Sequence, residues 1–363
     1  MIDPIRAFLN SRHRDGWASG LPIAGGIVAG ADKDPAAKTT LLLFDDSGTP
    51  AAVAKVARRP AGERALRSEA AVLTDLWAEG TPIVHGFVPR LIAIERIAGR
   101  LVLCTSMVGG SPMTRRYYRP GHISSPELVR RDFDLAGGWL EQFHRQTRRT
   151  AVFDPEMGSV LVDRVLARYV ARFGQTADEE VLFADVLRAA DDLFGMELPM
   201  VGVHGDYAIG NLLVDRDRVS GVVDWEFGSV GGPPFRDVYK FPTSYGFYLD
   251  RAAPGRRAVP GHPGREAMAA RWSRFGDWPN LIGFAYSFFG RGWFPDLVRD
   301  YVLVGLDGLQ IPHAANAVFF PVFLAEQAVA LDDPEFQQGY RSLLAGFGHE
   351  RRSSWLWRSE VPA

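Results

Sequence analysis

The chain has 363 residues and a formal net charge of −2, and 47% of its residues are hydrophobic and 23% charged. These values are typical of a globular protein, and the near-neutral charge gives no electrostatic case for a nucleic acid or an anionic membrane as partner. Small molecules are therefore the expected partners. A chain of this length exceeds one ordinary core, so we expect two lobes.

The single cysteine, Cys104, excludes an internal disulfide, and no Cys/His cluster has the spacing of a zinc site. Cys104 lies in an apolar run, which predicts a buried free thiol. The N-terminal residues lack a basic region followed by an apolar stretch, and no apolar run approaches the length of a membrane span. These features predict a cytoplasmic protein.

The N-terminal third predicts an antiparallel meander of β-strands. Its β-rich apolar runs are separated by glycine-rich or Asp-Ser-Gly turns, and they cover residues 22–30, 39–44, 51–56, 90–94 and 100–104. Gly26 lies with Gly25 and Gly30 where a loop that covers a nucleotide would be expected. Glycines would let the backbone approach phosphates there, although a hairpin that needs positive φ would use them equally well.

Lysine is rare in this sequence, with four against a total of 41 lysines and arginines. A lysine within an apolar strand therefore suggests a specific role for its charge. Lys55 is such a residue, in the run Ala-Val-Ala-Lys-Val. A compact ammonium there would bind phosphate oxygens as a point charge. The alternative is a lysine that protects an edge strand from aggregation.

The next segment, residues 64–77, has the spacing of an amphipathic helix. Glu69 borders its apolar stripe, so its carboxylate should point to the lobe interior and need a cationic partner. Lys55 is the expected partner. Glu63 and Glu79 are rivals, but they lie near the helix ends and are interpreted as solvated.

The stretch 201–224 carries the clearest chemistry. An apolar run leads to His204 and Asp206 in a polar loop; Asn211 precedes a second apolar run, and a third run ends at Asp224. One carboxylate here can accept a proton from an attacking hydroxyl, while the amide oxygen and the other carboxylate hold Mg²⁺. A lone His-Gly-Asp would more often be a simple turn. The ordered set of groups favours phosphoryl transfer.

The string His-Gly-Asp, four residues, Asn, an apolar run and Val-Asp-Trp-Glu resembles the aminoglycoside phosphotransferase and choline kinase family, whose fold is like that of protein kinases. The resemblance implies Asp206 as catalytic base, Asn211 as a metal ligand, and Asp224 as the counterpart of the kinase Asp-Phe-Gly aspartate. It also implies an α+β bilobal fold. Residues 1–107 would form a small antiparallel β lobe that binds the nucleotide, and residues 108–363 a larger, mainly helical lobe for catalysis and acceptor binding.

Further roles follow from position in that family. Backbone groups of Ser106 and Met107 would meet the nucleotide base at the hinge between the lobes. Asp237 would brace the catalytic loop, unless it merely caps a helix, and His204 would support the same loop. His144, near the end of a helix, is interpreted as structural.

The implied reaction is transfer of the γ-phosphoryl of ATP, or of GTP, to a hydroxyl of an antibiotic or other natural product, with Mg²⁺ as cofactor. A protein kinase is disfavoured, because His-Gly-Asp replaces His-Arg-Asp and no Ala-Pro-Glu segment follows. A sugar or choline-type metabolic kinase remains an alternative. A pseudokinase scaffold, which would be expected to have lost one of the motif residues, is the alternative from another class.

The acceptor is predicted from the charges of residues 241–363, which hold twelve Arg and no Lys against twelve Asp plus Glu. Polycationic aminoglycosides need surrounding carboxylates, and this segment has no acidic excess. Its aromatics suit a sugar face or a nucleoside, so we expect a neutral or weakly charged acceptor over an aminoglycoside. The alternative is a polycationic acceptor bound by a local acidic cluster, with Asp296, Asp307 and Glu326 as its possible members. Candidate acceptor contacts are Glu226, Tyr245, Tyr248, Trp278, Trp293 and Phe294, and residues 251–265 are interpreted as an exposed loop.

Overall fold

The computed structural model describes residues 1–13, 22–31, 37–252, 282–331 and 333–357. The chain divides into two compact units. The first comprises Met1–Pro112, His204–Asp206 and Asn211–Val230, and the second comprises Met113–Val203, Tyr207–Gly210 and Gly231–Ala363. The sequence prediction placed residues 201–224 wholly in the C-terminal lobe. Instead, Asp206, Asn211 and Asp224 belong to the same compact unit as the N-terminal sheet.

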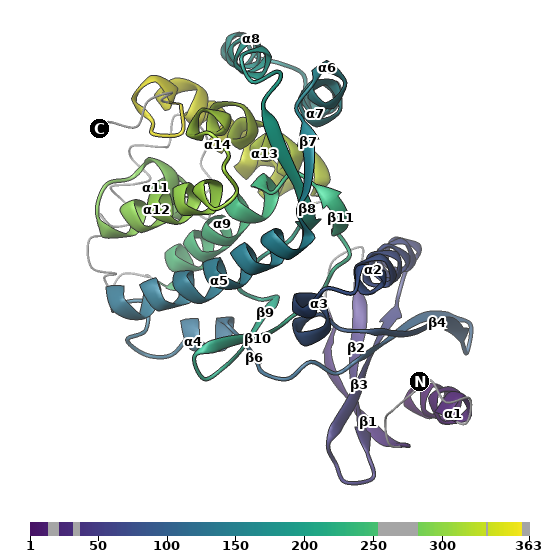
Figure 1. The fold of residues 1–363 in the computed structure, drawn as a ribbon. Helices are drawn as coiled ribbons and strands as arrows, with labels where there is room; N and C mark the ends of the chain where they lie inside the picture. The colour runs from purple at the N-terminus through teal and green to yellow at the C-terminus, as the bar shows by residue number, and fades with distance from the viewer. Residues whose placement is uncertain (14–21, 32–36, 253–281, 332, 358–363) are drawn as a thin grey trace. The chain divides into compact units, whose positions relative to one another are not determined.

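The first unit is built on a five-stranded antiparallel sheet with the order β1-β2-β3-β5-β4, of which Figure 1 labels β1, β2, β3 and β4. Lys55 lies in β3, where it pairs with Thr40 on one side and Leu103 on the other. The edge-strand explanation for this lysine is therefore wrong, because β3 is flanked on both sides. The strands are β1 (Ile23–Ala31), β2 (Lys38–Asp45), β3 (Pro50–Ala57), β4 (Leu91–Ile97) and β5 (Arg100–Ser106).

Three helices accompany this sheet: α1 (Ile2–His13), α2 (Pro60–Glu79) and α3 (Pro82–Phe87). Helix α2 begins with a proline at its first position and ends at Gly80, whose φ of 67° suits a helix C-cap. Its apolar stripe packs on the sheet, with Leu66 and Leu73 fully buried. Glu69 lies within the same buried face at 1% exposure, as the stripe predicts.

Residues 211–223 form a hairpin in the first unit. Strands β9 (Leu212–Asp215) and β10 (Arg218–Val222) pair antiparallel, and β6 (Ser111–Pro112) adds to the outer edge of β9. The pairing continues past the strands, because the Val223 N–H donates to the Asn211 carbonyl at 3.0 Å. Asn211 and Asp224 are thereby brought to the same open end of the hairpin.

The second unit is mainly helical, with a small sheet in which β7 and β8 pair antiparallel (Figure 1). Ser125 caps α5 by accepting a hydrogen bond from the Leu128 N–H, and α13 is buried almost all round. No helix among the described residues is long and apolar enough to cross a membrane. The longer helices are α5 (Pro126–Thr147), α7 (Arg164–Phe173), α8 (Ala177–Asp191), α9 (Phe235–Ala252), α11 (Ile282–Phe289), α12 (Trp293–Asp307), α13 (Asn316–Ala330) and α14 (Pro334–Glu350). The remaining elements are α4 (Thr114–Tyr117), β7 (Arg149–Val152), α6 (Pro155–Gly158), a π-helical turn (Ser159–Asp163), β8 (Glu197–Val203), β11 (Ser229–Gly232) and two 3₁₀ turns (His313–Ala315, Arg351–Ser353).

Candidate functional site

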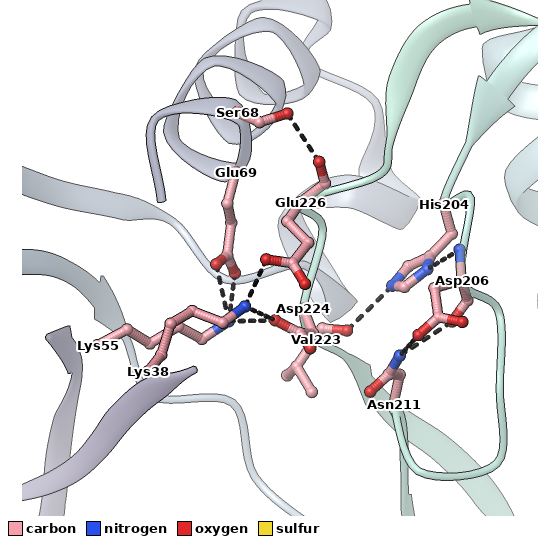
Figure 2. Close-up of polar contacts among 10 residues, drawn as sticks. All are labelled: Lys38, Lys55, Ser68, Glu69, His204, Asp206, Asn211, Val223, Asp224 and Glu226. Carbon is pink, nitrogen blue, oxygen red and sulfur yellow. Dashed lines mark hydrogen bonds and ion pairs between the residues drawn. The ribbon is translucent and has the colours of Figure 1, made fainter. Parts of the chain in front are cut away.

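His204 anchors the loop that carries Asp206. Its Nε2 lies 3.0 Å from the Val223 carbonyl, and its Nδ1 accepts the backbone N–H of Asp206 at 3.2 Å (Figure 2). Since a carbonyl only accepts, Nε2 carries the proton and the imidazole is the neutral Nε2–H tautomer. The buried ring thus ties the loop to the residue that precedes Asp224. A supporting role of His204 in catalysis stays a prediction.

Asn211 holds the Asp206 carboxylate. Its Nδ2 donates to Asp206 Oδ2 at 3.0 Å and to the Asp206 carbonyl at 2.9 Å (Figure 2). This arrangement uses the amide nitrogen and leaves Oδ1 as the Asn211 atom that a hard cation would take. The hairpin therefore brings together the carboxylate and the carboxamide that the sequence singled out.

Gly205 shows why this loop reads His-Gly-Asp. Its φ is +80°, and a Cβ at this position would lie 2.1 Å from the Phe227 carbonyl oxygen. Any other residue would strain the backbone and collide with the chain that follows Asp224. The close approach of the two segments thus depends on glycine.

Lys55 lies at the centre of a charge cluster in the first unit (Figure 2). Its Nζ is 2.6 Å and 2.8 Å from the two carboxylate oxygens of Glu69, and 2.8 Å from Asp224 Oδ1. The predicted Lys55–Glu69 ion pair is confirmed. Glu63 instead pairs with Arg96 at 2.6 Å, at the outer end of α2.

Lys38 is a second lysine in the cluster, and no sequence motif singled it out. Its Nζ is 3.2 Å from Asp224 Oδ1 and also forms an ion pair with Glu226 (Figure 2). The strand register of the structure explains its place: Thr40 pairs with Lys55, and Lys38 lies two residues from Thr40 on β2. Because side chains alternate along a strand and paired residues share a face, Lys38 and Lys55 leave the same face of the sheet.

The cluster has two ammonium groups, from Lys38 and Lys55, and three carboxylates, from Glu69, Asp224 and Glu226. Burial works to raise the pKa of Asp224, but the two lysines outweigh it and hold that pKa well below the ordinary value. Burial likewise opposes the charge of Lys55, yet Glu69 and Asp224 raise its pKa. Asp224 is therefore ionised at neutral pH.

Glu226 differs from Asp224 in the balance of its surroundings. Burial and the neighbouring Asp224 raise its pKa, and the Lys38 ammonium opposes them. Its backbone carbonyl accepts a hydrogen bond from Ser68 Oγ at 2.7 Å, which ties this segment to α2. The predicted contact of Glu226 with an acceptor stays a prediction, because here its carboxylate is engaged by Lys38.

Asp224 adopts a φ of +70°, in the left-handed region that favours glycine. Aspartate is tolerated there better than most residues, but the conformation still costs free energy. It lies two residues after the end of β10, and the chain turns there toward Glu226. Strained backbone is common at functional sites, and here the strained residue is the one that both lysines contact.

The predicted hinge requires one correction. The Ser106 N–H donates to the Arg90 carbonyl at 2.8 Å, and Ser106 Oγ accepts the Arg90 N–H at 2.8 Å. The expectation that the Ser106 N–H is exposed for a nucleotide base is therefore wrong, because this contact closes the end of the β4–β5 hairpin. Met107 follows β5 and is half-buried. Its role at a base stays a prediction.

Gly26 lies within β1 and not at a hairpin turn. A Cβ there would come within 2.8 Å of a Leu43 methyl and 3.0 Å of the Leu42 carbonyl. Close packing of β1 on β2 therefore accounts for this glycine, and a phosphate contact stays a prediction.

In the second unit, Asp237 is fully buried as the third residue of α9. It is not the N-cap residue of this helix, because α9 begins two residues earlier, at Phe235. Tyr245 is also fully buried, and its hydroxyl donates to Asp132 Oδ2 at 3.0 Å. Aromatic residues surround it, so its observed role is in the core, and contact with an acceptor stays only a prediction. Trp293 is half-buried at the start of α12.

Other residues predicted to contact the acceptor, and the predicted exposed loop, fall outside the described part of the chain. The side chain of Tyr248, the residue Trp278 and most of the segment 251–265 lie outside the described residues. The expected structural roles of two other residues fit their burial, since Cys104 is 1% exposed and His144 is 2% exposed.

A model of the phosphotransferase enzyme family matches residues 38–270, well over half of the chain. The chain belongs to this family. Membership makes the protein a kinase-like phosphotransferase, and its α+β fold is that of the sequence prediction, with an antiparallel N-terminal sheet and a mainly helical C-terminal part. A search of curated proteins finds no match to this phosphotransferase.

Several solved structures are similar to this phosphotransferase. Macrolide 2'-phosphotransferase MphH from Brachybacterium faecium is 18% identical, with 93% of this chain and 97% of that chain covered and a TM-score of 0.44. A thermostable mutant of aminoglycoside phosphotransferase APH(4)-Ia is 11% identical, with coverage of 94% and 99% and a TM-score of 0.48. Aminoglycoside phosphotransferase APH(3'')-Id from Streptomyces rimosus is 19% identical, with coverage of 86% and 100% and a TM-score of 0.37. These likenesses are remote.

Proposed function

We propose that the protein transfers the γ-phosphoryl group of ATP, or of GTP, to a hydroxyl of a small antibiotic or other natural product. The observation that carries the proposal is the geometry of the first unit. There the Asp206–Asn211 pair is joined through His204 and Val223 to the cluster of Lys55, Glu69 and Asp224. A proton acceptor, a phosphate-binding cation and oxygen ligands for a metal thus lie on one connected framework.

In this proposal Asp206 acts as the base. Its carboxylate is oriented by Asn211 and accepts the proton of the acceptor hydroxyl as the oxygen attacks phosphorus. General base catalysis of this kind contributes about 10²–10⁴-fold in rate. Positioning and charge neutralisation supply most of the rest. His204 is a positioning residue that acts through the Asp206 backbone.

Mg²⁺ is the cation that this donor set suits. Asp224 offers an ionised carboxylate and Asn211 offers Oδ1, and both are oxygen donors of the kind that Mg²⁺ prefers. No group of three or more His, Cys, Asp or Glu side chains in the described part of the chain forms a complete metal site. Oxygens of the nucleotide phosphates would therefore complete the coordination, as is usual for this ion. When bound, Mg²⁺ would neutralise the charge that develops on the transferred phosphoryl group.

The two lysines of the cluster are assigned to binding of the nucleotide phosphates. Glu69 holds Lys55 with both carboxylate oxygens, so this ammonium is fixed in place to bind phosphate oxygens. Lys38 shares Asp224 with Lys55 and also pairs with Glu226. We propose that Lys38 is a second phosphate-binding cation, which exchanges its carboxylate partners for the nucleotide and so frees Asp224 for the metal.

A neutral or weakly charged acceptor is favoured over a polycation. The carboxylates that could have formed an acidic cluster already have side-chain partners in the second unit. Asp296 pairs with Arg299 at 3.2 Å, Asp307 lies 2.8 Å from His313 Nε2, and Glu326 pairs with Arg236. Pairing of this kind leaves less negative charge for several ammonium groups that must leave water.

The test is ADP formation with Mg²⁺ and ATP or GTP in the presence of a panel of acceptors. The panel should contain neutral sugars, nucleoside antibiotics, glycosylated macrolides and kanamycin-like polyamines. Turnover with a neutral compound supports the proposal. Efficient turnover confined to the polyamines would refute the acceptor class, and no turnover with any acceptor would favour the pseudokinase scaffold.

A further inference from the structure

The segment that follows β5, residues 108–112, lies against the hairpin of β9 and β10, and we call it the linker segment. Its last two residues form β6, in which Ser111 pairs with Val214 and Pro112 with Leu213. The linker segment and the hairpin both belong to the first unit. The chain that leaves β5 is therefore fixed to the hairpin that carries the proposed metal ligands.

Ser220 is the extra residue of a bulge in this hairpin. The register of the β9–β10 pair shifts between Val219 and Gly221, on either side of Ser220. The Ser220 hydroxyl donates to the Gly109 carbonyl at 2.7 Å. Bulges re-aim a side chain and are common next to active sites. Here the bulge directs a hydrogen bond from the hairpin to the linker segment.

Glycines make the close contact possible. Gly110 adopts a φ of +118°, and a Cβ there would lie 2.1 Å from Ser220 Oγ. A Cβ on Gly221 would lie 2.1 Å from Val108 Cγ1. A larger residue is therefore excluded at Gly110 by backbone conformation and by space, and at Gly221 by space alone. Gly109 differs from both, because a Cβ there would meet no atom within 4 Å.

The bulge, the hydrogen bond and the glycines coincide at one contact. A bulge and a glycine within a strand both weaken the ladder, so their coincidence indicates that the contact has a function. Its two sides lie close to the two ends of a bound nucleotide in the proposed function. Met107, where the base is predicted to bind, directly precedes Val108, and Gly221 lies three residues before Asp224 in the chain. The contact thus joins the segment predicted to bind the base to the strand that leads to the metal ligand.

We propose that Val108, Ser220 and Gly221 are positioning residues, which fix the spacing between the segment that binds the nucleotide base and the end of the hairpin that binds the metal. They act through the backbone of Met107 and do not themselves touch the reacting groups. A nucleotide must reach both ends at once, so its affinity depends on this spacing. A ligand that consists of phosphates alone does not depend on it. The inference rests on the proposed function, in which the first unit binds the nucleotide.

Gly221→Ala tests the contact, because the added methyl group must displace Val108 and with it the neighbouring Met107. The affinity for Mg²⁺-ATP, measured by calorimetry with the full-length protein, should fall about tenfold, which is the scale of one lost hydrogen bond. Inorganic tripolyphosphate with Mg²⁺ is the matched ligand, since it offers phosphates without a base, and its affinity should not change. Adding Val108→Ala removes the methyl group that collides, so the double variant should regain the affinity for Mg²⁺-ATP.

Two further variants complete the test. Gly109→Ala is the control, since it adds a methyl group to the same segment without a collision and should bind Mg²⁺-ATP as wild type does. Ser220→Ala removes only the hydrogen bond to Gly109 and should show the same selective loss, about threefold. It replaces Gly221→Ala if urea unfolding shows that this variant is not folded.

The outcomes that would overturn the proposal are distinct from failure of the proposed function. Unchanged affinity of Gly221→Ala and Ser220→Ala for Mg²⁺-ATP would overturn it, as would an equal loss of affinity for tripolyphosphate. A loss in Gly221→Ala that Val108→Ala does not restore would do the same. Wild type that binds no Mg²⁺-ATP would instead refute the proposed function, and this inference with it.

Discussion

The Lys38–Glu226 pair offers a test of the charge cluster that needs no knowledge of the acceptor. Lys38 and Glu226 side chains are 13% and 12% exposed, so the pair is largely buried. Lys38→Met leaves three carboxylates around Lys55 alone. Loss of one partner from a buried pair costs about 3–5 kcal/mol, and the residual exposure places this pair at the lower end, so we expect about 3 kcal/mol.

The double-mutant cycle isolates the pair. Lys38→Met, Glu226→Gln and the double variant are unfolded in urea beside wild type, and the coupling energy is calculated from the four free energies of unfolding. We expect Glu226→Gln to rescue much of the loss in Lys38→Met, with a coupling of about 1–3 kcal/mol. Additive effects of the two substitutions would refute the ion pair as a determinant of stability.

The same variants predict a dependence on pH. The pKa of Glu226 is already raised above 4.5 by burial and Asp224, and loss of Lys38 raises it further. A carboxyl with a raised pKa stabilises the fold at pH below its unfolded pKa, and this contribution is lost as the pH rises through the folded pKa. The penalty of Lys38→Met should therefore be smaller at pH 5 than at pH 8. A penalty that does not change with pH would contradict the assigned cause.

Three further predictions concern the catalytic loop and Asp224. Gly205→Ala should lower the free energy of unfolding, measured in urea, by at least about 2 kcal/mol, because its φ is left-handed and its Cβ collides with Phe227. Gly210→Ala is the control and should have little effect, because a Cβ there meets no atom within 4 Å. Asp224→Ala should weaken the binding of Mg²⁺-ATP by about tenfold or more but spare metal-free ATP, as measured by calorimetry; equal metal-dependent affinity would contradict the ligand assignment. Since the pKa of Asp224 lies below 3.8, its ion pairs contribute stability above that pH and lose it as the pH falls further, so Asp224→Asn and wild type should differ in stability at pH 6 and converge in strong acid.

The sequence predicted the framework of the site because its signals are local. Alternation of apolar residues located β3, and the helical stripe of α2 placed Glu69 on the buried face. A buried carboxylate needs a cation, and Lys55 was the lysine in an apolar strand, so this pair followed from the sequence. Asn211 and Asp224 flank two runs that read as a hairpin, and hairpin pairing brings its ends together.

The missed features depend on contacts between distant segments. Lys38 begins its strand without a motif, and its partners Asp224 and Glu226 lie more than 180 residues away in the chain. The Ser106 N–H is taken by Arg90 because the β4–β5 hairpin extends further than the apolar pattern indicated. Tyr245 was counted as a pocket aromatic, but composition does not distinguish aromatics in a core from those at a surface.

The most direct test of the account is the rate of phosphoryl transfer by Asp206→Asn beside wild type, with an acceptor from the ADP-release screen. Asparagine keeps the shape and the contact with Asn211 but cannot take the acceptor proton. We predict a loss in kcat of about 10²–10⁴-fold. Affinity for Mg²⁺-ATP should change little. A variant that retains near-normal kcat would remove Asp206 from the mechanism and contradict the proposed function of this site.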